Sequence, residues 1–232
     1  MSPVALVTGG AGDIGRGVVT ALAAEGYAVA VLDLTVNPRA AWSVHCDLTD
    51  EAAVADAVRT VEAEVGEPEV LVCAAGIVGR GAVRELSLPA WNRVMDASLT
   101  AAFLVTRAVL PAMVRRGEGA IVMLSSGLAR KGSAWGAPYA SAKAGIEALT
   151  KSVALEHAAD GIRCNAVAPG PVRTTMTGAN PNFDAETALA AIPLGRLGEV
   201  DEVVAPILFL LGPGASYITG QVVQVNGGML MP

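Results

Sequence analysis

Short apolar runs alternate with longer stretches of helical periodicity along the whole chain, and this alternation constrains the fold more than any other feature. Such apolar runs are typical of buried strands, and each intervening stretch can form a helix that returns the chain to the same sheet. Strands are expected at 4–8, 27–33, 42–47, 70–76, 120–126, 161–170 and 221–228. Helices are expected at about 12–25, 50–65, 90–115, 138–160, 185–191 and 200–211. The pattern predicts an α/β fold, doubly wound, with a parallel sheet of about seven strands and helices on both faces.

One connection departs from this pattern. The segment between Asp33 and Trp42 is too short for a full helix and contains Asn37 and Pro38, which are typical of turns. A loop is expected there. No linker, repeat or low-complexity tract interrupts the chain, so residues 1–232 are predicted to form a single domain.

Composition excludes several classes of function. The net charge is −6 and no block of basic residues occurs, which argues against nucleic acid as a partner. The apolar stretch at 203–211 is too short for a membrane span, and the first expected strand begins too early to leave room for a signal peptide. The expected location is the cytoplasm, with no membrane partner.

The cysteines and histidines do not form a recognisable metal site. Cys46, Cys73 and Cys164 are odd in number, lack C-x-x-C spacing and fall in or beside expected strands, so they are interpreted as small core residues. His45 and His157 have no partners at ligand spacing. No metal is expected.

A glycine-rich turn stands directly between the first expected strand and the first expected helix. Gly10, Gly12 and Gly15 have the spacing G-x-G-x-x-G. Glycine lets the backbone approach a pyrophosphate, and the helix N-terminus supplies amide donors and the positive end of its dipole. A tight structural turn is the alternative, but this context favours a Rossmann-type dinucleotide site.

Asp33 ends the second expected strand, about 20 residues beyond the turn. A carboxylate there can accept hydrogen bonds from both ribose hydroxyls and would repel a 2′-phosphate, so NAD is predicted in preference to NADP. A helix cap or a solvated strand end is the alternative role for Asp33. Arg39 is near enough in sequence to weaken the NAD preference if the loop folds back.

Three polar residues are candidates for catalysis. Tyr139 and Lys143 share one face of an expected helix because they are four residues apart, and Ser126 ends an earlier strand. A free tyrosine is only about 0.1% ionised at neutral pH. An ammonium about 4 Å away would supply the roughly 4 kcal/mol needed to lower the tyrosine pKa by about three units. The Ser126 hydroxyl is suited to holding a carbonyl or alcohol oxygen.

Together these motifs resemble the short-chain dehydrogenase/reductase family over almost the whole chain, and its compact, 3-oxoacyl-reductase-like subfamily in particular. The stretches that carry the resemblance are TGGAGDIG, CDLTD, CAAG, LSS, YASAK, PGPVRT, PLGRLGEVDEV and YITGQVVQVNGG. The resemblance implies that Tyr139 is the acid/base, that Lys143 lowers its pKa and holds the nicotinamide ribose, and that Ser126 positions the substrate oxygen. It also implies a homo-oligomer, a dimer or tetramer formed through the helices at 90–115 and 138–160.

Cofactor contacts are implied in the same way. Asp47 and Leu48 would contact adenine, Ala75 and Gly76 would flank the cofactor, and Thr174 would touch the carboxamide. The full set of expected cofactor-binding residues is Gly9, Gly12, Asp13, Ile14, Gly15, Asp33, Leu34, Asp47, Leu48, Ala75, Gly76, Tyr139, Lys143, Pro169, Gly170, Val172 and Thr174.

Three positions depart from the family pattern. Asp13 stands where the compact subfamily has glycine, and its side chain is expected to turn away from the pyrophosphate. CAAG replaces the usual Asn-Asn-Ala-Gly. Ser98 stands where the family has an asparagine that supports a water-linked proton relay from the lysine; Ser98 either holds the water instead or weakens the relay.

The residues expected to contact the substrate form less distinctive motifs than those expected to bind the cofactor. Residues 175–192 are expected to form a mobile lid, or alternatively a rigid helical excursion. Trp135 is either a wall of the substrate pocket or a loop-packing residue. Glu147, Glu156 and Arg107 are interpreted as solvated or interface charges.

These features predict an NAD-dependent oxidoreductase that interconverts a ketone and a secondary alcohol. One rival is an NADPH-dependent 3-oxoacyl reductase. Another, prompted by Ser98 and CAAG, is a cofactor-binding scaffold or sensor with little catalysis.

Overall fold

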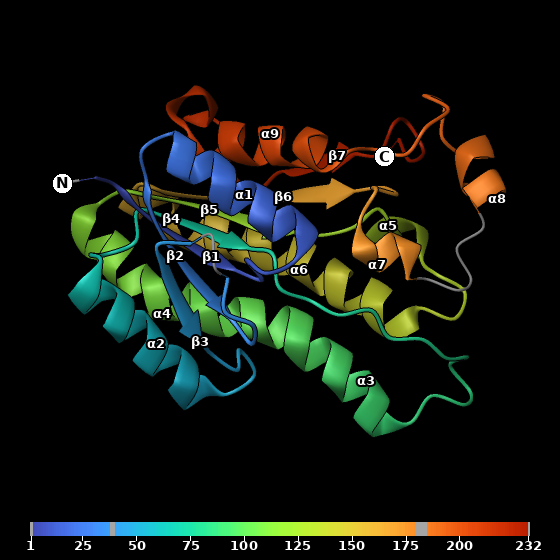
Figure 1. Cartoon of the computed structure of the whole chain (residues 1–232), viewed down its shortest axis with the longest axis horizontal. Coiled ribbons are helices and arrows are strands. Elements are labelled where there is room, and N and C mark those ends of the chain that lie inside the picture. Colours follow the sequence, from blue (N-terminus) through green and yellow to red (C-terminus); the bar gives the residue numbers. More distant parts are fainter. Residues whose placement is uncertain (1, 38–39, 180–184, 232) are drawn as a thin grey trace.

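The structure, a computed structural model, describes residues 2–37, 40–179 and 185–231 (Figure 1). The strands are β1 (Val4–Thr8), β2 (Ala28–Asp33), β3 (Trp42–His45), β4 (Val70–Cys73), β5 (Gly119–Leu124), β6 (Ile162–Pro169) and β7 (Val222–Val225). They form one sheet in the order β3-β2-β1-β4-β5-β6-β7, in which every neighbouring pair is parallel. The predicted α/β fold with seven parallel strands is confirmed.

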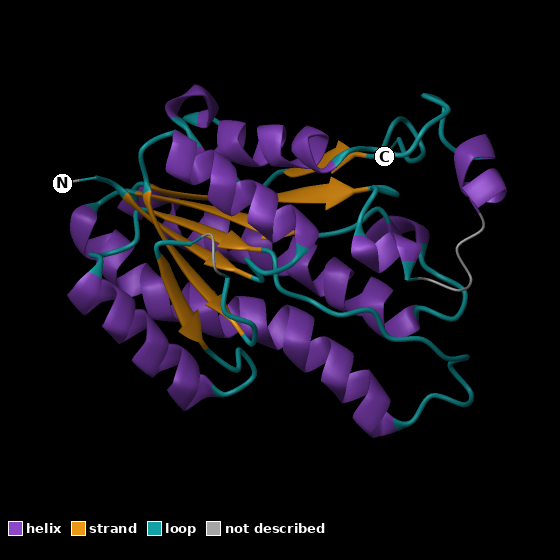
Figure 2. Ribbon diagram, in the orientation of Figure 1, coloured by secondary structure: helices purple, strands orange, loops and turns teal. Residues whose placement is uncertain are grey.

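Helices cover both faces of the sheet. The longer helices are α1 (Asp13–Ala24), α2 (Glu51–Glu64), α3 (Leu88–Met95), α4 (Ala101–Arg116), α6 (Ala137–His157) and α9 (Val200–Leu211). Helices α1 and α9 pack together on one face, and α2, α4 and α6 cover the other (Figures 1 and 2). Successive strand residues alternate between two cores, so Leu6 packs toward α2 and α4 whereas Val7 packs toward α1 and α9.

The strand order indicates where a ligand would bind, at the carboxyl ends of the interior strands β1 and β4. From β1 the chain builds outward to β2 and β3, whereas β4 starts again on the other side of β1 and the sheet then grows to β7. Loops that follow β1 and β4 therefore diverge at their carboxyl ends. In open parallel sheets this point is where ligands bind.

Several expected boundaries differ from the structure. Between β2 and β3 the described residues contain no helix, as predicted. The helix expected at 90–115 begins earlier and contains a π-helical turn, η1 (Asp96–Thr100), between α3 and α4. Four shorter elements were not anticipated as such: α5 (Leu128–Lys131), η2 (Ala158–Asp160), α7 (Thr175–Gly178) and η3 (Pro213–Ala215). A short α8 (Ala185–Ala190) matches the helix expected at 185–191.

The stretch Leu88–Arg116 has 29 residues and contains an 18-residue window with a mean hydropathy of 1.6, so by length and composition it is apolar enough to cross a membrane. The sequence reading considered only the shorter run at 203–211 and overlooked this one. Half of the apolar window is buried inside the domain, and α4 packs against α2 and α6. The stretch is explained by its position as a covering layer on the sheet.

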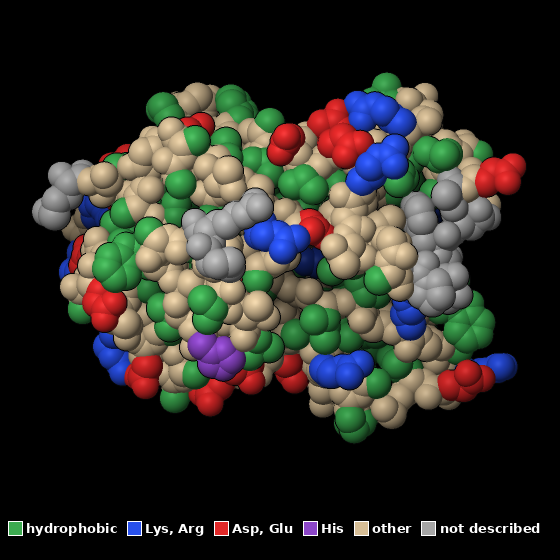
Figure 3. Space-filling model, viewed as in Figure 1, with side chains coloured by type: hydrophobic (Ala, Val, Ile, Leu, Met, Phe, Trp, Pro, Cys, Tyr) green, Lys and Arg blue, Asp and Glu red, His purple; other side chains and the backbone are tan. Residues whose placement is uncertain are grey.

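Charged side chains on the face shown in Figure 3 are interspersed, with acidic and basic groups next to one another.

The expected core role of the three cysteines is confirmed, because Cys46, Cys73 and Cys164 are all buried and unpaired thiols. Among the described residues, no group of three or more His, Cys, Asp or Glu side chains is placed to hold a metal ion.

Candidate active site

The glycine-rich turn after β1 brings backbone closer to backbone than any side chain would allow. Gly9 has φ of +67°, and a Cβ on it would lie 2.5 Å from the backbone nitrogen of Ala75 in the loop after β4. A Cβ on Gly15 would lie 2.1 Å from the carbonyl oxygen of Gly9. Only glycine fits at these two positions. The turn therefore leaves the N-terminus of α1 open at the carboxyl edge of the sheet, as a pyrophosphate cradle requires.

Asp33 lies beside this turn at the end of β2. One carboxylate oxygen accepts a hydrogen bond from the backbone N–H of Ala11 at 3.0 Å, and the other accepts from Thr35 at 3.0 Å. These bonds fix the direction of the carboxylate and leave a lone pair on each oxygen. A side-chain amide supports the same turn, since Asn37 donates to the Gly10 carbonyl at 2.8 Å.

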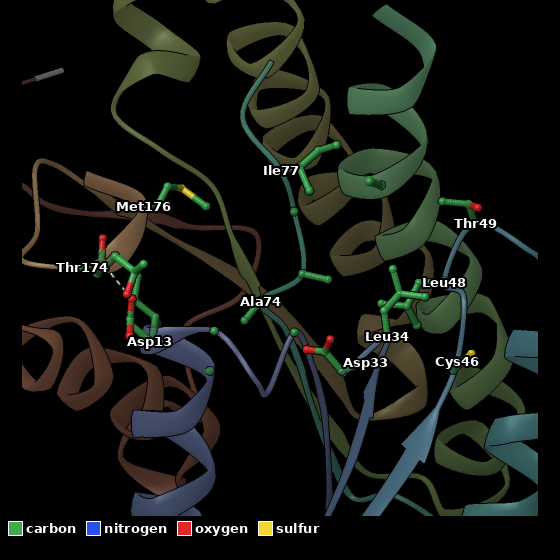
Figure 4. Close-up of a pocket in the computed structure, with 18 of the residues that line it drawn as sticks. Asp13, Asp33, Leu34, Cys46, Leu48, Thr49, Ala74, Ile77, Thr174 and Met176 are labelled. Atoms are coloured by element: carbon green, nitrogen blue, oxygen red, sulfur yellow. Dashed lines mark hydrogen bonds between the residues drawn. The ribbon is translucent and has the colours of Figure 1, made fainter. Parts of the chain in front are cut away.

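A cleft of about 370 Å³ runs from the end of β2 across the glycine turn to the loop after β6. Of the expected cofactor-binding residues, it is lined by Gly9, Gly12, Asp13, Ile14, Gly15, Asp33, Leu34, Asp47, Leu48, Ala75, Gly76 and Thr174. Figure 4 shows Leu34, Leu48 and Thr49 on one side of the cleft and Asp13, Thr174 and Met176 on the other. Among the lining residues, all of which are described, three are carboxylates and none is Lys or Arg. Arg39 lies outside the described residues.

Asp13 remains in the wall of the cleft, where its carboxylate is fully engaged. It pairs with Arg16 and accepts a 2.7 Å hydrogen bond from the backbone N–H of Thr175, at the start of α7 (Figure 4). Burial alone would raise the pKa of this carboxyl, but the bonds from Thr175 and Arg16 hold it below its ordinary value. The side chain therefore stays ionised and is directed at these partners.

Ser126, Tyr139 and Lys143 come together beyond one end of this cleft. Ser126 follows β5, and Tyr139 and Lys143 lie one turn apart on α6. The Ser126 hydroxyl lies near enough to the Tyr139 hydroxyl to lower the pKa of the phenol. Lys143 is 4% exposed, donates to the Leu124 carbonyl at 2.6 Å and lies 5.6 Å from the centre of the Tyr139 ring. The three predicted catalytic residues thus lie together, with Ser126 and Lys143 buried and Tyr139 half-buried.

The electrostatics of the cluster are set mainly by burial. Burial raises the pKa of the Tyr139 phenol above its ordinary value, and the hydrogen bond with Ser126 opposes that rise only in part. Burial also lowers the pKa of Lys143 to about 8. Lys143 is not among the groups that shift the pKa of Tyr139 here, and its ammonium donates to the Leu124 carbonyl at the end of β5. The lowering of the Tyr139 pKa by Lys143 stays a prediction. The Tyr139 hydroxyl is protonated at neutral pH.

Gly76 connects the cluster to the cleft. It lines the cleft, and a Cβ on it would lie 3.4 Å from Lys143 Nζ and 3.1 Å from Ser98 Oγ. Ser98 is 1% exposed, and its hydroxyl has no hydrogen-bond partner among the described residues. It lies in the π-helical turn η1, a distortion that is frequent at functional sites. The position that departs from the family pattern therefore faces the lysine side of the cluster.

Five of the expected cofactor-binding residues do not line the cleft. Tyr139 and Lys143 belong to the cluster beyond its end, and the other three are Pro169, Gly170 and Val172. Pro169 and Gly170 lie at the end of β6, where the Pro169 carbonyl accepts from Gly127 at 3.0 Å and the Gly170 N–H donates to Val225 at 2.9 Å. Val172 is buried in the wall of a separate cavity of about 200 Å³. These residues shape the loop that carries Thr174, which does line the cleft.

Thr175 and Met176, which belong to the expected lid, also line the cleft. Sequence reasoning missed five lining residues: Cys46, Thr49, Ala74, Ile77 and Ala97. Most are immediate neighbours of predicted residues, so proximity in sequence was the available signal. Ala97 was harder to anticipate, because only the π-helical turn carries it to the cleft. Glu147 was also misjudged: it is 7% exposed and bonded within the domain rather than solvated.

A family model described as enoyl-(acyl carrier protein) reductase matches residues 9–230. The 3-oxoacyl-[acyl-carrier-protein] reductase of Escherichia coli is 35% identical, with 98% of this chain and 97% of that protein covered. The chain belongs to the short-chain dehydrogenase/reductase family. Another family relative, the cis-4-hydroxycyclohexanecarboxylate dehydrogenase of Sinomonas cyclohexanicum, is 39% identical, with 97% and 95% covered. The crystal structure of an Agrobacterium tumefaciens protein, provisionally named a gluconate dehydrogenase, is 34% identical with a TM-score of 0.92 and coverage of 99% and 96%.

Membership of this family settles the general activity. The chain is a nicotinamide-dependent oxidoreductase that acts on CH–OH or keto groups.

Proposed function

We propose that this enzyme interconverts a secondary alcohol and a ketone with NAD(H), and that Tyr139 exchanges the proton with the substrate oxygen. The observation that carries the proposal is the position of Gly76, which lines the cleft of about 370 Å³ and also abuts Lys143 of the Ser–Tyr–Lys cluster. A substrate oxygen beside Tyr139 would therefore lie next to whatever occupies that end of the cleft.

The residues present fit a dinucleotide. The Gly9–Gly15 turn offers backbone where a Cβ would collide, and the cleft end near Asp33 is acidic. A nicotinamide cofactor would be held along this cleft and, when bound, supplies or accepts the hydride. Among the described residues, the lining contains no Lys or Arg, which favours a free ribose 2′-hydroxyl over a 2′-phosphate and supports NAD.

Tyr139, Ser126 and Lys143 would each carry out one of the remaining steps. Tyr139, protonated at neutral pH, donates its proton to the carbonyl oxygen during ketone reduction. Ser126 holds that oxygen by a hydrogen bond, which is suited to the charge that develops on it. Lys143 would bind the nicotinamide ribose, and its charge would help Tyr139 when the alcohol is oxidised.

Initial rates test this proposal directly. Cyclic and open-chain secondary alcohols and their ketones are assayed with NAD(H) and NADP(H), and Tyr139→Phe is measured beside the wild type. We expect turnover with NAD(H), and a loss of at least roughly 100-fold in Tyr139→Phe with little change in NADH binding, because the phenol serves only the proton step. Full activity in Tyr139→Phe would contradict the proton assignment. Tight NADH binding without turnover on any substrate would favour the scaffold or sensor alternative.

An NADPH-dependent 3-oxoacyl reductase is the second candidate. It is supported by the E. coli relative named for that activity, which covers nearly the whole chain. A 3-oxoacyl thioester offered with NADH and with NADPH separates the two, since the acidic cleft predicts poor use of NADPH. Efficient NADPH-dependent reduction of the thioester would establish this second activity.

The lid at 175–192 remains a proposal. Met176 on α7 is 50% exposed and lines the cleft, which supports a specificity role for this segment. Phe183 lies outside the described residues. Trp135 is supported as part of the substrate side by its 59% exposure, four residues before Tyr139.

We also propose a cytoplasmic homo-oligomer, a dimer or tetramer. Phe103 on α4 is 41% exposed and Leu155 on α6 is 84% exposed, so both helices present apolar side chains outward. Burying them between subunits is favourable. Light scattering coupled to gel filtration measures the mass, and a monomer at micromolar concentration would contradict the proposal.

A further inference from the structure

A buried carboxylate on α6 contacts both sides of the segment that carries Ser126. Glu147 Oε1 accepts a hydrogen bond from Ser125 Oγ at 3.1 Å, and Glu147 Oε2 accepts from Arg130 Nε at 3.1 Å. Ser125 immediately precedes Ser126, and Arg130 belongs to α5, which begins two residues after it. The Glu147 carboxylate therefore binds residues on both sides of Ser126 but makes no hydrogen bond with Ser126 itself.

Each contact restrains the serine from a different direction. The Ser125 hydroxyl also lies 3.3 Å from the Lys143 carbonyl, so it ties the end of β5 to the backbone of α6. On the other side, Ser126 Oγ accepts from the Leu128 N–H at 3.2 Å and its carbonyl accepts from Ala129 at 2.9 Å. Moving α5 would therefore move Ser126, and the Arg130–Glu147 pair holds α5 against α6.

Helix α6 carries the other catalytic candidates as well. Tyr139, Lys143 and Glu147 are spaced at intervals of four residues, so they lie along one face of the same helix. A restraint between Glu147 and the Ser126 segment consequently sets the distance between the Ser126 and Tyr139 hydroxyls. We propose that Glu147 is a positioning residue that keeps Ser126 in register with Tyr139 for the proton step.

The proposal rests on the roles proposed above for Ser126 and Tyr139. A purely structural role is the competing explanation, because removing the buried Glu147 carboxylate from its pair with the partly exposed Arg130 would destabilise the fold by itself. The two explanations differ in kinetics. A structural role predicts a lower melting temperature with unchanged kcat, KM and pH dependence in the protein that remains folded.

Glu147→Leu and Glu147→Gln are compared with the wild type in both reaction directions. We expect kcat to fall about 100-fold in Glu147→Leu, because a displacement of about 1 Å at a positioned group has effects of this size. We expect a smaller loss in Glu147→Gln, whose amide oxygen still accepts one of the two bonds. NADH affinity should stay within about twofold, since neither Glu147 nor its two partners lines the cofactor cleft.

The pH profile supplies a readout that a structural role would not move. The Ser126 hydrogen bond lowers the pKa of Tyr139, so losing it should shift half-maximal alcohol oxidation to higher pH. Lys143 and the Cys73 thiol are the neighbouring titratable groups on α6 and β4, and neither is altered by these variants. A shifted profile in Glu147→Leu therefore reports on the Ser126–Tyr139 bond.

Matched controls come from the same elements. Glu156→Leu makes the same change on the exposed part of α6, and Lys131→Met is the exposed counterpart of Arg130→Met on α5. Both controls should retain wild-type rates. Ser125→Ala and Arg130→Met each remove one contact and should each lower kcat, which keeps the proposal testable if Glu147→Leu does not fold.

Ser126→Ala separates the outcomes. If Ser126→Ala loses activity while Glu147→Gln, Ser125→Ala and Arg130→Met all keep wild-type kcat and pH dependence, the positioning role is overturned and the proposed function stands. If Ser126→Ala itself keeps full activity, the role proposed for Ser126 in holding the substrate oxygen is wrong. In that case, positioning of Ser126 by Glu147 has no effect on catalysis.

Discussion

Asp13 accepts a 2.7 Å hydrogen bond from the backbone N–H of Thr175, a residue 162 positions later in the chain. The bond joins the cofactor turn to the first residue of the proposed lid. It also keeps an ionised carboxylate at the N-terminus of α1, where a pyrophosphate would bind. If the turn binds a cofactor as proposed, this one side chain would link cofactor affinity to the position of the proposed lid.

We predict that Asp13→Asn binds NADH more tightly, by roughly threefold to tenfold, because one negative charge leaves the pyrophosphate site. Asp13→Ala should add a raised KM for the substrate, since the bond to Thr175 is lost as well. Fluorescence titration of NADH and steady-state kinetics measure the two effects. Asp56→Asn, an exposed carboxylate on α2, serves as the control. Weaker NADH binding in Asp13→Asn would show that the carboxylate aids the cofactor.

Asp33 should control the choice between NAD and NADP. In Asp33→Asn the ratio of kcat/KM for NADP(H) over NAD(H) should rise at least tenfold, because the repulsion of a 2′-phosphate is removed while one acceptor for the turn remains. Asp47→Asn removes a carboxylate from the same end of the cleft, where it holds Thr49, and should change the ratio less. Equal ratios in Asp33→Asn and the wild type would remove the basis for the NAD assignment.

Lys143 should weaken the fold at neutral pH while supporting activity. Its pKa is about 8 when folded and 10.5 ordinarily, so between these values the unfolded chain binds more protons and stability rises with pH. Below about pH 8 the buried charge lowers the free energy of unfolding by on the order of 3 kcal/mol. Lys143→Met should therefore melt higher than the wild type at pH 7, lose this pH dependence and lose turnover. Lys151→Met, exposed on the same helix, should do none of these.

Alcohol oxidation should become faster as the pH rises, because the raised pKa of Tyr139 keeps it protonated near neutrality. In Ser126→Ala the phenolate loses a hydrogen bond, so the residual rate should reach half its maximum at a higher pH than in the wild type. A pH series of kcat for both proteins measures this. An unchanged midpoint would mean that Tyr139 is not the group that titrates.

Trp135 has φ of +65°, a conformation that is strained for a bulky residue and is held by a 2.9 Å hydrogen bond from Gly81 to its carbonyl. Trp135→Gly should be more stable than Trp135→Ala by about 1 kcal/mol, since both lose the ring but only glycine relieves the backbone. If the ring forms a wall of the substrate pocket, both variants should raise KM to the same extent. Urea denaturation and KM measurements check the pair.

The architecture followed from local patterns. Buried parallel strands must be apolar throughout, and the helices between them must present an apolar face, so both are visible as periodicity. The glycine turn and Asp33 were predictable for a related reason: Gly9 and Gly15 meet steric limits that no other residue satisfies, and Asp33 ends a strand beside them.

Contacts between segments far apart in the chain determined the remaining features of the site. The sequence by itself determined the parallel sheet, the cofactor turn and the Tyr139–Lys143 spacing, because each depends on residues a few positions apart. Only the tertiary structure placed Lys143 on the Leu124 carbonyl, Glu147 beside Ser125 and Arg130, and Asp13 on Thr175. Burial and partner direction set the charge state of such groups, and both arise from packing between segments far apart in the chain.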